Sequence, residues 1–207
     1  MPKSILYYIG DPMCSWCWGF QPTFESIIEM LPPHIDVQYV MGGLAKDTGE
    51  PMPIDTQNYI KKQWESVTDK SSAKFNWDFW ETCEPRRSTY PACRAVIAAG
   101  EQDPEALGDM FQAIQQAYYL EARNPSNSDT LISLAEDINL DVERFTRDLK
   151  SPEINEKLYQ DFEIRRSLHA DKFPTVILDH NQEALWLTYG YDDREIVLDT
   201  LEAALLS

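Results

Sequence analysis

The sequence has few positive charges, few cysteines and no long hydrophobic run, and each shortage excludes a class of protein. The 207 residues include 18 lysines and arginines against 35 aspartates and glutamates, which gives a formal net charge of −17. Because sequence-independent binding to nucleic acid or anionic lipid requires clustered cations, this charge argues against both partners. No stretch approaches the ~18 apolar residues of a membrane-spanning helix. The sequence therefore predicts a soluble protein without nucleic-acid or membrane partners.

The sequence also has few cysteines and only a short apolar run near its start. Four cysteines are present, and a globule of this size buries roughly 70% of its unfolded surface, so its core needs neither disulfides nor a metal. The apolar run at residues 5–9 is shorter than the ~7–15 residues of a secretory signal core. If Met1 is the native start, we expect a cytoplasmic protein; if a leader was removed, we expect a periplasmic one.

Apolar runs and helical periodicity predict three successive regions. Residues 4–9 are nearly all apolar, as in a strand covered on both faces, and residues 35–39 alternate as a second strand. The helical pattern between them contains Pro22, which we expect to kink or interrupt the helix. The pattern is helical from about residue 55 to about residue 169. Residues 175–178 and 184–189 then predict a hairpin with a turn at 179–182, followed by a last amphipathic helix.

Cys14-Ser15-Trp16-Cys17 carries the most specific chemistry. The motif follows the first predicted strand and starts a helix, where positions i and i+3 lie on one face, close enough for a disulfide. Unpaired N–H groups and the positive dipole end favour a thiolate there. About 2 kcal/mol of such stabilisation would lower a thiol pKa from about 8.5 to about 7. By position, Cys14 is the attacking sulfur and Cys17 the shielded resolving sulfur, while the Asp11 carboxylate opposes the thiolate slightly.

Two alternatives share this spacing, namely a structural zinc site and a pair of inert buried thiols. Zinc needs four ligands, and beyond the motif the chain offers Cys83, Cys93 and three histidines without paired spacing. A redox pair that needs no metal and no cofactor is therefore the favoured interpretation. A non-catalytic zinc or binding module stays open as an alternative.

Phe173-Pro174-Thr175 immediately precedes the third predicted strand. Proline cannot donate to a sheet ladder, so it belongs at the start or the edge of a strand. A trans proline satisfies that requirement, whereas a cis Pro174 would form a tight turn. The segment gains significance because a Cys-x-x-Cys motif ends the first strand.

Together these segments resemble the thioredoxin fold, and specifically the DsbA-like thiol–disulfide oxidoreductases, which carry a helical insertion between βαβ and ββα. Residues 11–19 (DPMCSWCWG), 90–96 (YPACRAV) and 173–175 (FPT) are similar to the FrnE-like branch, often described as predicted protein disulfide isomerases. The resemblance covers essentially the whole chain. It implies an α/β, thioredoxin-like domain from residues 1–54 and 168–207, and an all-helical insertion domain from residues 55–167.

The resemblance also implies roles for single residues. Cys14 would be the nucleophile and Cys17 the resolving thiol. Pro174 would be cis and pack against the disulfide, which would leave the backbone at Phe173 to bind an extended peptide together with Trp16.

The two central residues of the motif, Ser15 and Trp16, would tune the redox potential. The implied partners are protein or peptide thiols and disulfides, with glutathione as a further candidate. Because a strong oxidant stays reduced in a reducing compartment, the missing leader favours reductase or isomerase activity.

A second enzyme class is similar outside the motif. Kappa-class glutathione transferases and hydroxychromene carboxylate isomerases use glutathione and generally carry serine where Cys14 stands. The intact motif argues against this class. The strongly acidic net charge also argues against it, because glutathione is an anionic tripeptide.

The other two cysteines and several aromatic residues are weaker candidates for a functional role. Cys83 lies near Arg86 and Arg87, which could lower its pKa, but a partly buried thiol is favoured. Cys93 is expected to be buried, with a Cys83–Cys93 disulfide as the alternative. We expect Trp77, Phe79 and Trp80 to pack between helices. Met13, Trp16 and Trp18 are expected either to pack against the helical insertion or to form an apolar binding site for unfolded chains.

Overall fold

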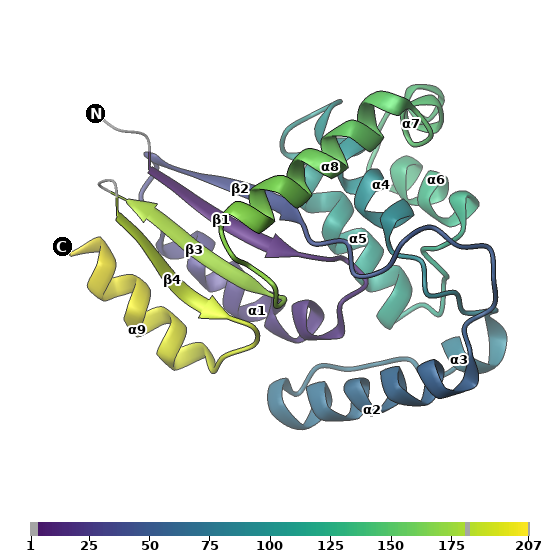
Figure 1. Ribbon diagram of the computed structural model, residues 1–207, viewed down its shortest axis with the longest axis horizontal. Coiled ribbons are helices and arrows are strands. Elements are labelled where there is room, and N and C mark those ends of the chain that lie inside the picture. Colours follow the sequence, from purple (N-terminus) through teal and green to yellow (C-terminus); the bar gives the residue numbers. More distant parts are fainter. Residues whose placement is uncertain (1–3, 181–182, 207) are drawn as a thin grey trace.

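The computed structural model describes residues 4–180 and 183–206, and Figure 1 shows a sheet at one side of the molecule and a group of helices at the other. The chain begins with β1 (Ser4–Gly10), α1 (Ser15–Met30) and β2 (Ile35–Met41). It continues through α2 (Ile54–Ser71), α3 (Phe79–Thr82), α4 (Tyr90–Gly100), α5 (Ala106–Tyr119), α6 (Ser128–Asp137), α7 (Val142–Asp148) and α8 (Pro152–Ser167). It ends with β3 (Thr175–His180), β4 (Glu183–Tyr189) and α9 (Arg194–Leu205).

The sheet has the strand order β2-β1-β3-β4. β1 runs parallel to β2, with Gly10 opposite Met41, and antiparallel to β3, with Ile9 opposite Thr175. β3 and β4 are antiparallel and contain an irregularity between Val176 and Ile177. This arrangement confirms the predicted βαβ…ββα order and the α/β, thioredoxin-like class.

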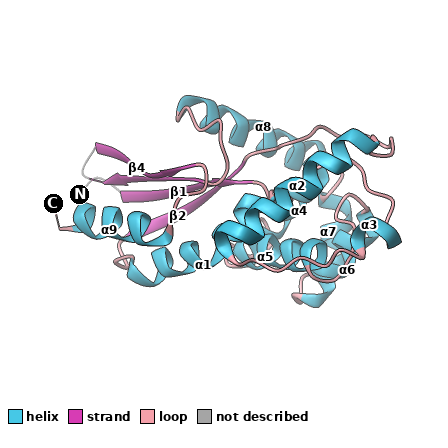
Figure 2. Cartoon of the chain, turned by 90° about the horizontal axis from the view of Figure 1, so that it is seen from below, coloured by secondary structure: helices cyan, strands magenta, loops and turns pink. Residues whose placement is uncertain are grey.

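Helices cover both faces of the sheet. α1 and α9 lie on one face and α8 crosses the other, as Figure 2 shows. Side chains alternate accordingly: Leu6 and Tyr8 join the large core with α1, whereas Ile9 packs with Val40 and Ile177 on the α8 side. A strand buried on both faces was expected from the unbroken apolar run, and β1 confirms it.

The helical segment between β2 and β3 approaches α1 closely. A side chain at Gly19 would place its Cβ 2.7 Å from both Ser71 Oγ and Val67 Cγ1 of α2, so only glycine permits this contact. The carboxyl ends of β1 and β2 point toward this helical group in Figure 1. The start of α1 therefore lies where sheet and helices meet. The division into two domains stays a prediction.

Two local expectations require correction. Pro22 does not divide α1 into two helices, because α1 runs from Ser15 to Met30 with the buried positions Phe20, Phe24 and Ile27 on one face. The expected turn at 179–182 begins later, since β3 includes His180, which pairs with Glu183. Residues 181–182 lie outside the described part of the chain.

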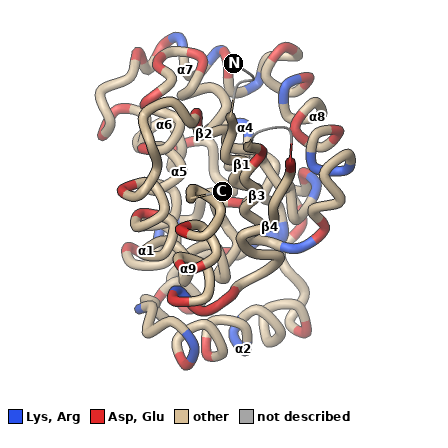
Figure 3. Tube along the Cα trace, turned by 90° about the vertical axis from the view of Figure 1, so that its left-hand side faces the viewer, with Lys and Arg blue, Asp and Glu red and all other residues tan. Residues whose placement is uncertain are grey.

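The distribution of charged residues reflects the excess of acidic residues in the sequence. Figure 3 shows carboxylates spread over the outer helices and loops, with lysines and arginines interspersed among them. None of the helices in the described part of the chain combines the length and the apolar character needed to cross a bilayer.

Candidate functional site

The two motif cysteines lie at the junction of β1 and α1. Cys14 is the N-cap residue of α1, and its N–H donates to the carbonyl of Asp11 at 2.9 Å. Cys17 lies one turn into the helix. The exposed fraction is 7% for Cys14 and 0% for Cys17. The structure thus brings both cysteines to the first turn of a helix, where both are buried and Cys14 is the less completely buried of the two.

The electrostatic surroundings of the two sulfurs are unequal. The hydrogen bond from the Cys17 thiol, helped by the backbone N–H groups of Cys17 and Trp16, lowers the pKa of Cys14 against the opposing effects of burial and of Asp11. Burial, followed by the hydrogen bond and the charge of Cys14, raises the pKa of Cys17 well above its ordinary value. The arrangement therefore favours a Cys14 thiolate beside a protonated Cys17.

The segment before β3 meets the motif. The Phe173–Pro174 peptide bond is cis, as the family resemblance implied, and Cys14 Sγ makes a weak hydrogen bond to the Phe173 carbonyl oxygen at 3.9 Å. The Phe173 ring packs on Gly42 and lies 5.7 Å from the guanidinium of Arg165. These contacts fix Phe173 between the motif and the loop after β2.

A groove of about 560 Å³ opens beside this contact. Trp16 forms part of its wall; its ring lies 5.3 Å from that of Tyr191, and its Nε1 donates to Gln63 Oε1 at 3.0 Å. The other lining residues combine aromatic surface with charges of both signs, and they are Phe173, Tyr189, Gly190, Lys70, Lys172, Asp192 and Asp193. The groove beside Cys14 is therefore walled by aromatic rings and carries two lysines and two aspartates.

The structure brings most of the predicted site residues together. Cys14, Cys17, Trp16, Phe173 and Pro174 meet at one place, with Trp16 and Phe173 facing the groove. The motif residue Ser15 is buried and does not line the groove.

Asp11 is the residue whose structural role sequence reasoning missed. Its fully buried carboxylate accepts hydrogen bonds from the N–H groups of Met13 and Leu44, each at 2.8 Å, and from the Thr89 hydroxyl at 2.7 Å, while Cys93 Sγ lies 3.5 Å away. Burial raises the pKa of Asp11 despite these donors. The carboxylate thus ties the motif turn to the loop after β2 and to α4. An aspartate three positions before Cys14 was visible in the sequence, but its partners are distant along the chain.

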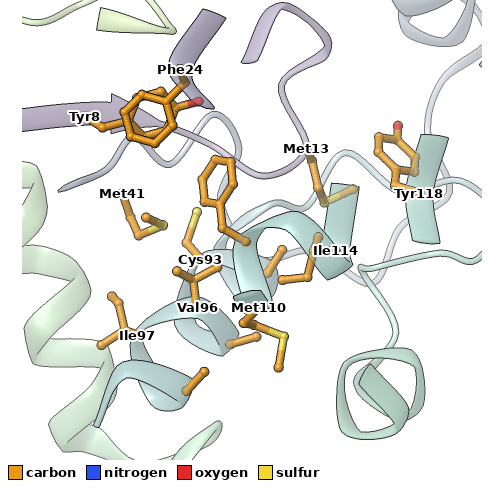
Figure 4. Close-up of a cluster of buried hydrophobic side chains, with 14 of the residues drawn as sticks. Tyr8, Met13, Phe24, Met41, Cys93, Val96, Ile97, Met110, Ile114 and Tyr118 are labelled. Atoms are coloured by element: carbon orange, nitrogen blue, oxygen red, sulfur yellow. The ribbon is translucent and has the colours of Figure 1, made fainter. Parts of the chain in front are cut away.

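The other two cysteines are not part of the site. Cys93 is buried, as expected, in a cluster that includes Met41, Val96 and Met110 and is shown in Figure 4. Burial raises the pKa of Cys93 well above its ordinary value. Cys83 is partly buried and donates to the Ala122 carbonyl at 2.9 Å. Both are free thiols in this structure.

The aromatic residues separate into packing and groove groups. Trp77, Phe79 and Trp80 surround Trp64 with ring distances of 5.5, 6.1 and 5.0 Å, which confirms their role in packing. Trp18 stacks on Tyr119 and donates to the Lys74 carbonyl. Of the motif aromatics, Trp16 is the one that faces the groove.

The zinc alternative requires four ligands that converge on one point. Within residues 4–180 and 183–206, no three histidine, cysteine, aspartate or glutamate side chains converge in a way that could hold a metal ion. The alternative of a zinc module therefore gains no support from the described side chains.

The chain is similar to a known family profile and to curated proteins. A thioredoxin family profile matches residues 7–198. Two curated relatives are the ClpXP adapter proteins SpxH of Halalkalibacterium halodurans and Bacillus subtilis, each 24% identical. The matches cover 97% and 95% of this chain and 67% and 68% of the relatives, so the chain spans about two thirds of their length.

Solved structures agree with the fold. A Nitrosomonas europaea protein assigned as a protein disulfide isomerase is similar with a TM-score of 0.87 and 29% identity, over 99% of this chain and 98% of that one. The cytosolic disulfide reductase DsbM of Pseudomonas aeruginosa is similar with a TM-score of 0.80 and 23% identity, over 98% of both chains. DsbM has also been solved with glutathione, and that structure is 22% identical with a TM-score of 0.79.

Proposed function

We propose that this chain, which belongs to the thioredoxin family, is a thiol–disulfide oxidoreductase. It has a DsbA-like fold and would act on protein or peptide disulfides through Cys14 and Cys17. The observation that carries this proposal is the pair of unequal thiols at the start of α1. One cysteine is the less completely buried and has a lowered pKa, and its neighbour is completely buried with a raised pKa. That division of properties suits an attacking and a resolving thiol.

The reduction of a substrate disulfide would proceed in two steps. The Cys14 thiolate attacks one substrate sulfur, so that a mixed disulfide forms and the other substrate sulfur leaves as a thiolate that takes up a proton. Cys17 then loses its proton and attacks Cys14 Sγ. The Cys14–Cys17 disulfide forms, the second substrate thiol is released, and the two electrons come from the protein. Oxidation of a dithiol is the reverse sequence.

The groove would hold the substrate. An extended peptide could lie against the backbone at Phe173 and over the Trp16 ring, with Pro174 at the base. Lys70 and Lys172 would contact acidic groups of the substrate, and Asp192 and Asp193 would contact basic ones. Within the motif, Ser15 and Trp16 would set the redox potential through their contacts with the sulfurs. The potential of the pair relative to that of the compartment sets whether it reduces, isomerises or oxidises disulfides.

The test is the redox equilibrium of the purified protein in glutathione buffers, followed by tryptophan fluorescence and by mass spectrometry after thiol trapping. We expect a reversible two-electron transition that is absent in Cys14→Ser. Cys17→Ser should accumulate a mixed disulfide with a peptide substrate. No transition in the wild-type protein would overturn the proposal, and the midpoint of an observed transition would give the direction of electron flow.

A second candidate is an adapter role, in which the same surface binds a protein without turnover. It is favoured by the naming of the curated relatives as ClpXP adapters. A bound protein partner whose affinity is the same for the wild type and for Cys14→Ser, combined with no turnover of any disulfide, would favour this candidate over the enzyme.

Glutathione is the remaining substrate alternative. The similarity to a structure solved with glutathione favours it. Calorimetric titration with oxidised and reduced glutathione, compared with a peptide disulfide, separates a glutathione-dependent enzyme from one that prefers proteins.

A further inference from the structure

One buried hydroxyl lies against Cys17 and is not used in the reaction described above. Tyr8 belongs to β1 and has no exposed surface. A side chain at Gly10 would place its Cβ 3.2 Å from Cys17 Sγ, 3.2 Å from Tyr8 Cζ and 2.9 Å from Tyr8 Cε1. The hydroxyl-bearing end of the ring and the sulfur of Cys17 therefore both border the space that a side chain at Gly10 would fill.

The ring of Tyr8 is held by its neighbours. Its centroid lies 4.1 Å from that of Phe24, 5.4 Å from that of Tyr39 and 5.6 Å from that of Phe111. Figure 4 shows Tyr8 and Phe24 against one another in the core, and their ring planes are tilted by 33°. Packing of this kind leaves the ring with one orientation and directs the hydroxyl to one place.

The Tyr8 hydroxyl also has unused hydrogen-bonding capacity. Among the described residues it makes no well-aligned hydrogen bond, and Cys17 is the polar side chain with which it interacts most strongly. The buried hydroxyl of Tyr119, whose charge would interact with both motif cysteines, also lacks an aligned partner in the described part. Because an unpartnered buried polar group costs free energy, its presence beside a reacting sulfur calls for a functional explanation.

Resolution of the mixed disulfide creates the need for such a group. Cys17 must become a thiolate while it is completely buried, where a negative charge is poorly solvated. The backbone N–H of Asp11 already favours this thiolate. A second donor at the sulfur would stabilise the developing charge further.

We propose that the Tyr8 hydroxyl is a catalytic group of the resolving step, donating a hydrogen bond to Cys17 Sγ as that sulfur attacks Cys14; this inference rests on the proposed oxidoreductase function. The Cys17–H bond and the bond between Cys14 and the substrate sulfur break, and the Cys14–Cys17 bond forms. The departing substrate thiolate takes up one proton, so that the proton lost by Cys17 is balanced.

The phenol acts as a donor and not as a base. Burial, followed by the charge and hydrogen bond of Cys17, raises the pKa of Tyr8 well above its ordinary value. The hydroxyl therefore keeps its proton at neutral pH throughout the cycle.

The test compares Tyr8→Phe with Tyr39→Phe. Both variants lose one hydroxyl from the same ring cluster, but the Tyr39 hydroxyl faces Gly108 of α5, away from the cysteines. Reduced protein is mixed with a cysteine-containing peptide disulfide, quenched with acid and analysed by mass spectrometry. We expect the mixed disulfide to persist about tenfold longer in Tyr8→Phe, since a hydrogen bond to a charged group is lost. Its rate of formation should stay unchanged, and Tyr39→Phe should match the wild type.

A second measurement tests the hydroxyl without turnover. In the Cys14→Ser background, the pKa of Cys17, followed by alkylation rate against pH, should rise when Tyr8→Phe is added and stay constant when Tyr39→Phe is added. The inference is overturned if Tyr8→Phe resolves the mixed disulfide at a rate within twofold of wild type and leaves the pKa of Cys17 unchanged. Failure of Tyr8→Phe to fold would also overturn it, because the hydroxyl would then be a structural group. If no variant, nor the wild type, reduces any disulfide, the proposed function fails, and the Cys17 pKa comparison still decides whether the hydroxyl contacts the sulfur.

Discussion

The sulfur of Cys14 lies 3.9 Å from the backbone carbonyl oxygen of Phe173, although 159 positions separate the two residues in the sequence. The contact joins the first turn of α1 to the segment that enters β3. It places a peptide backbone beside the accessible thiol, at the edge of the groove. A substrate chain that binds along Phe173 would therefore bring its own sulfur to Cys14.

The lowered pKa of Cys14 predicts the pH dependence of its reactivity. The hydrogen bond from Cys17 and the N–H groups of the first turn stabilise the thiolate, so the thiolate fraction at pH 7 should exceed that of a free thiol. Alkylation of the reduced protein by iodoacetamide, measured against pH, should have its midpoint below the ordinary thiol range. Cys17→Ala should shift the midpoint upward, because it removes the side-chain donor to Cys14. A midpoint at or above about 8.5 in the wild type would contradict the prediction.

Asp11 is predicted to act on Cys14 through its charge and on the fold through its hydrogen bonds. Asp11→Asn removes a negative charge that opposes the Cys14 thiolate, so the alkylation midpoint of Cys14 should fall further. The amide cannot accept from every donor that the carboxylate serves, and the free energy of unfolding should fall by ~1–3 kcal/mol. Alkylation and urea denaturation measure the two effects.

Thr89→Val is the matched control for Asp11→Asn. It removes one hydrogen bond to the same carboxylate without changing any charge. It should therefore destabilise the fold while leaving the Cys14 midpoint in place. Equal shifts of that midpoint in both variants would show that geometry, and not charge, controls the thiol.

The sequence supports the fold and the reacting atoms far better than it supports their surroundings. The strands, the Cys14–Cys17 motif and the proline before β3 are local patterns, so periodicity and spacing were sufficient to find them. The partners of Asp11, the hydroxyl of Tyr8 and the groove wall at Tyr191 come from segments far apart in the chain. No local pattern marks them, because tertiary packing alone brings these side chains to the cysteines. The expected break at Pro22 was wrong, since α1 continues through it as one helix.

Trp16 and Trp18 are predicted to have separate roles despite their proximity in the motif. Trp16 is half-buried and lines the groove, so Trp16→Ala should raise the KM for a peptide disulfide about tenfold, as expected for the loss of an aromatic contact with the substrate. Trp18 stacks on Tyr119, so Trp18→Ala should instead lower the free energy of unfolding by ~2 kcal/mol or more. Steady-state kinetics and urea denaturation of both variants provide the comparison. The interpretation of the groove fails if Trp16→Ala leaves the KM unchanged.

Asp161 predicts a pH dependence of stability that is independent of the redox chemistry. Its carboxylate in α8 accepts a hydrogen bond from the N–H of Met41 at 2.9 Å, and burial raises its pKa to about 7 against that bond. The group is protonated in both the folded and unfolded states at low pH. As the pH rises from about 4 toward 7, the unfolded state ionises first and the folded state retains more protons, so stability falls.

Asp161→Asn should remove this dependence, because the amide does not titrate and its oxygen can still accept from Met41. Relative to wild type, the free energy of unfolding of the variant should rise by ~2 kcal/mol between about pH 5.5 and pH 8, since each pKa unit corresponds to ~1.4 kcal/mol. Urea denaturation at the two pH values measures this difference. The control is Glu156→Gln, an exposed position on the same helix, for which the difference should stay constant. If Asp161→Asn also shows no change between the two pH values, the carboxyl titrates alike in the folded and unfolded chains, and its burial has no energetic consequence in this pH range.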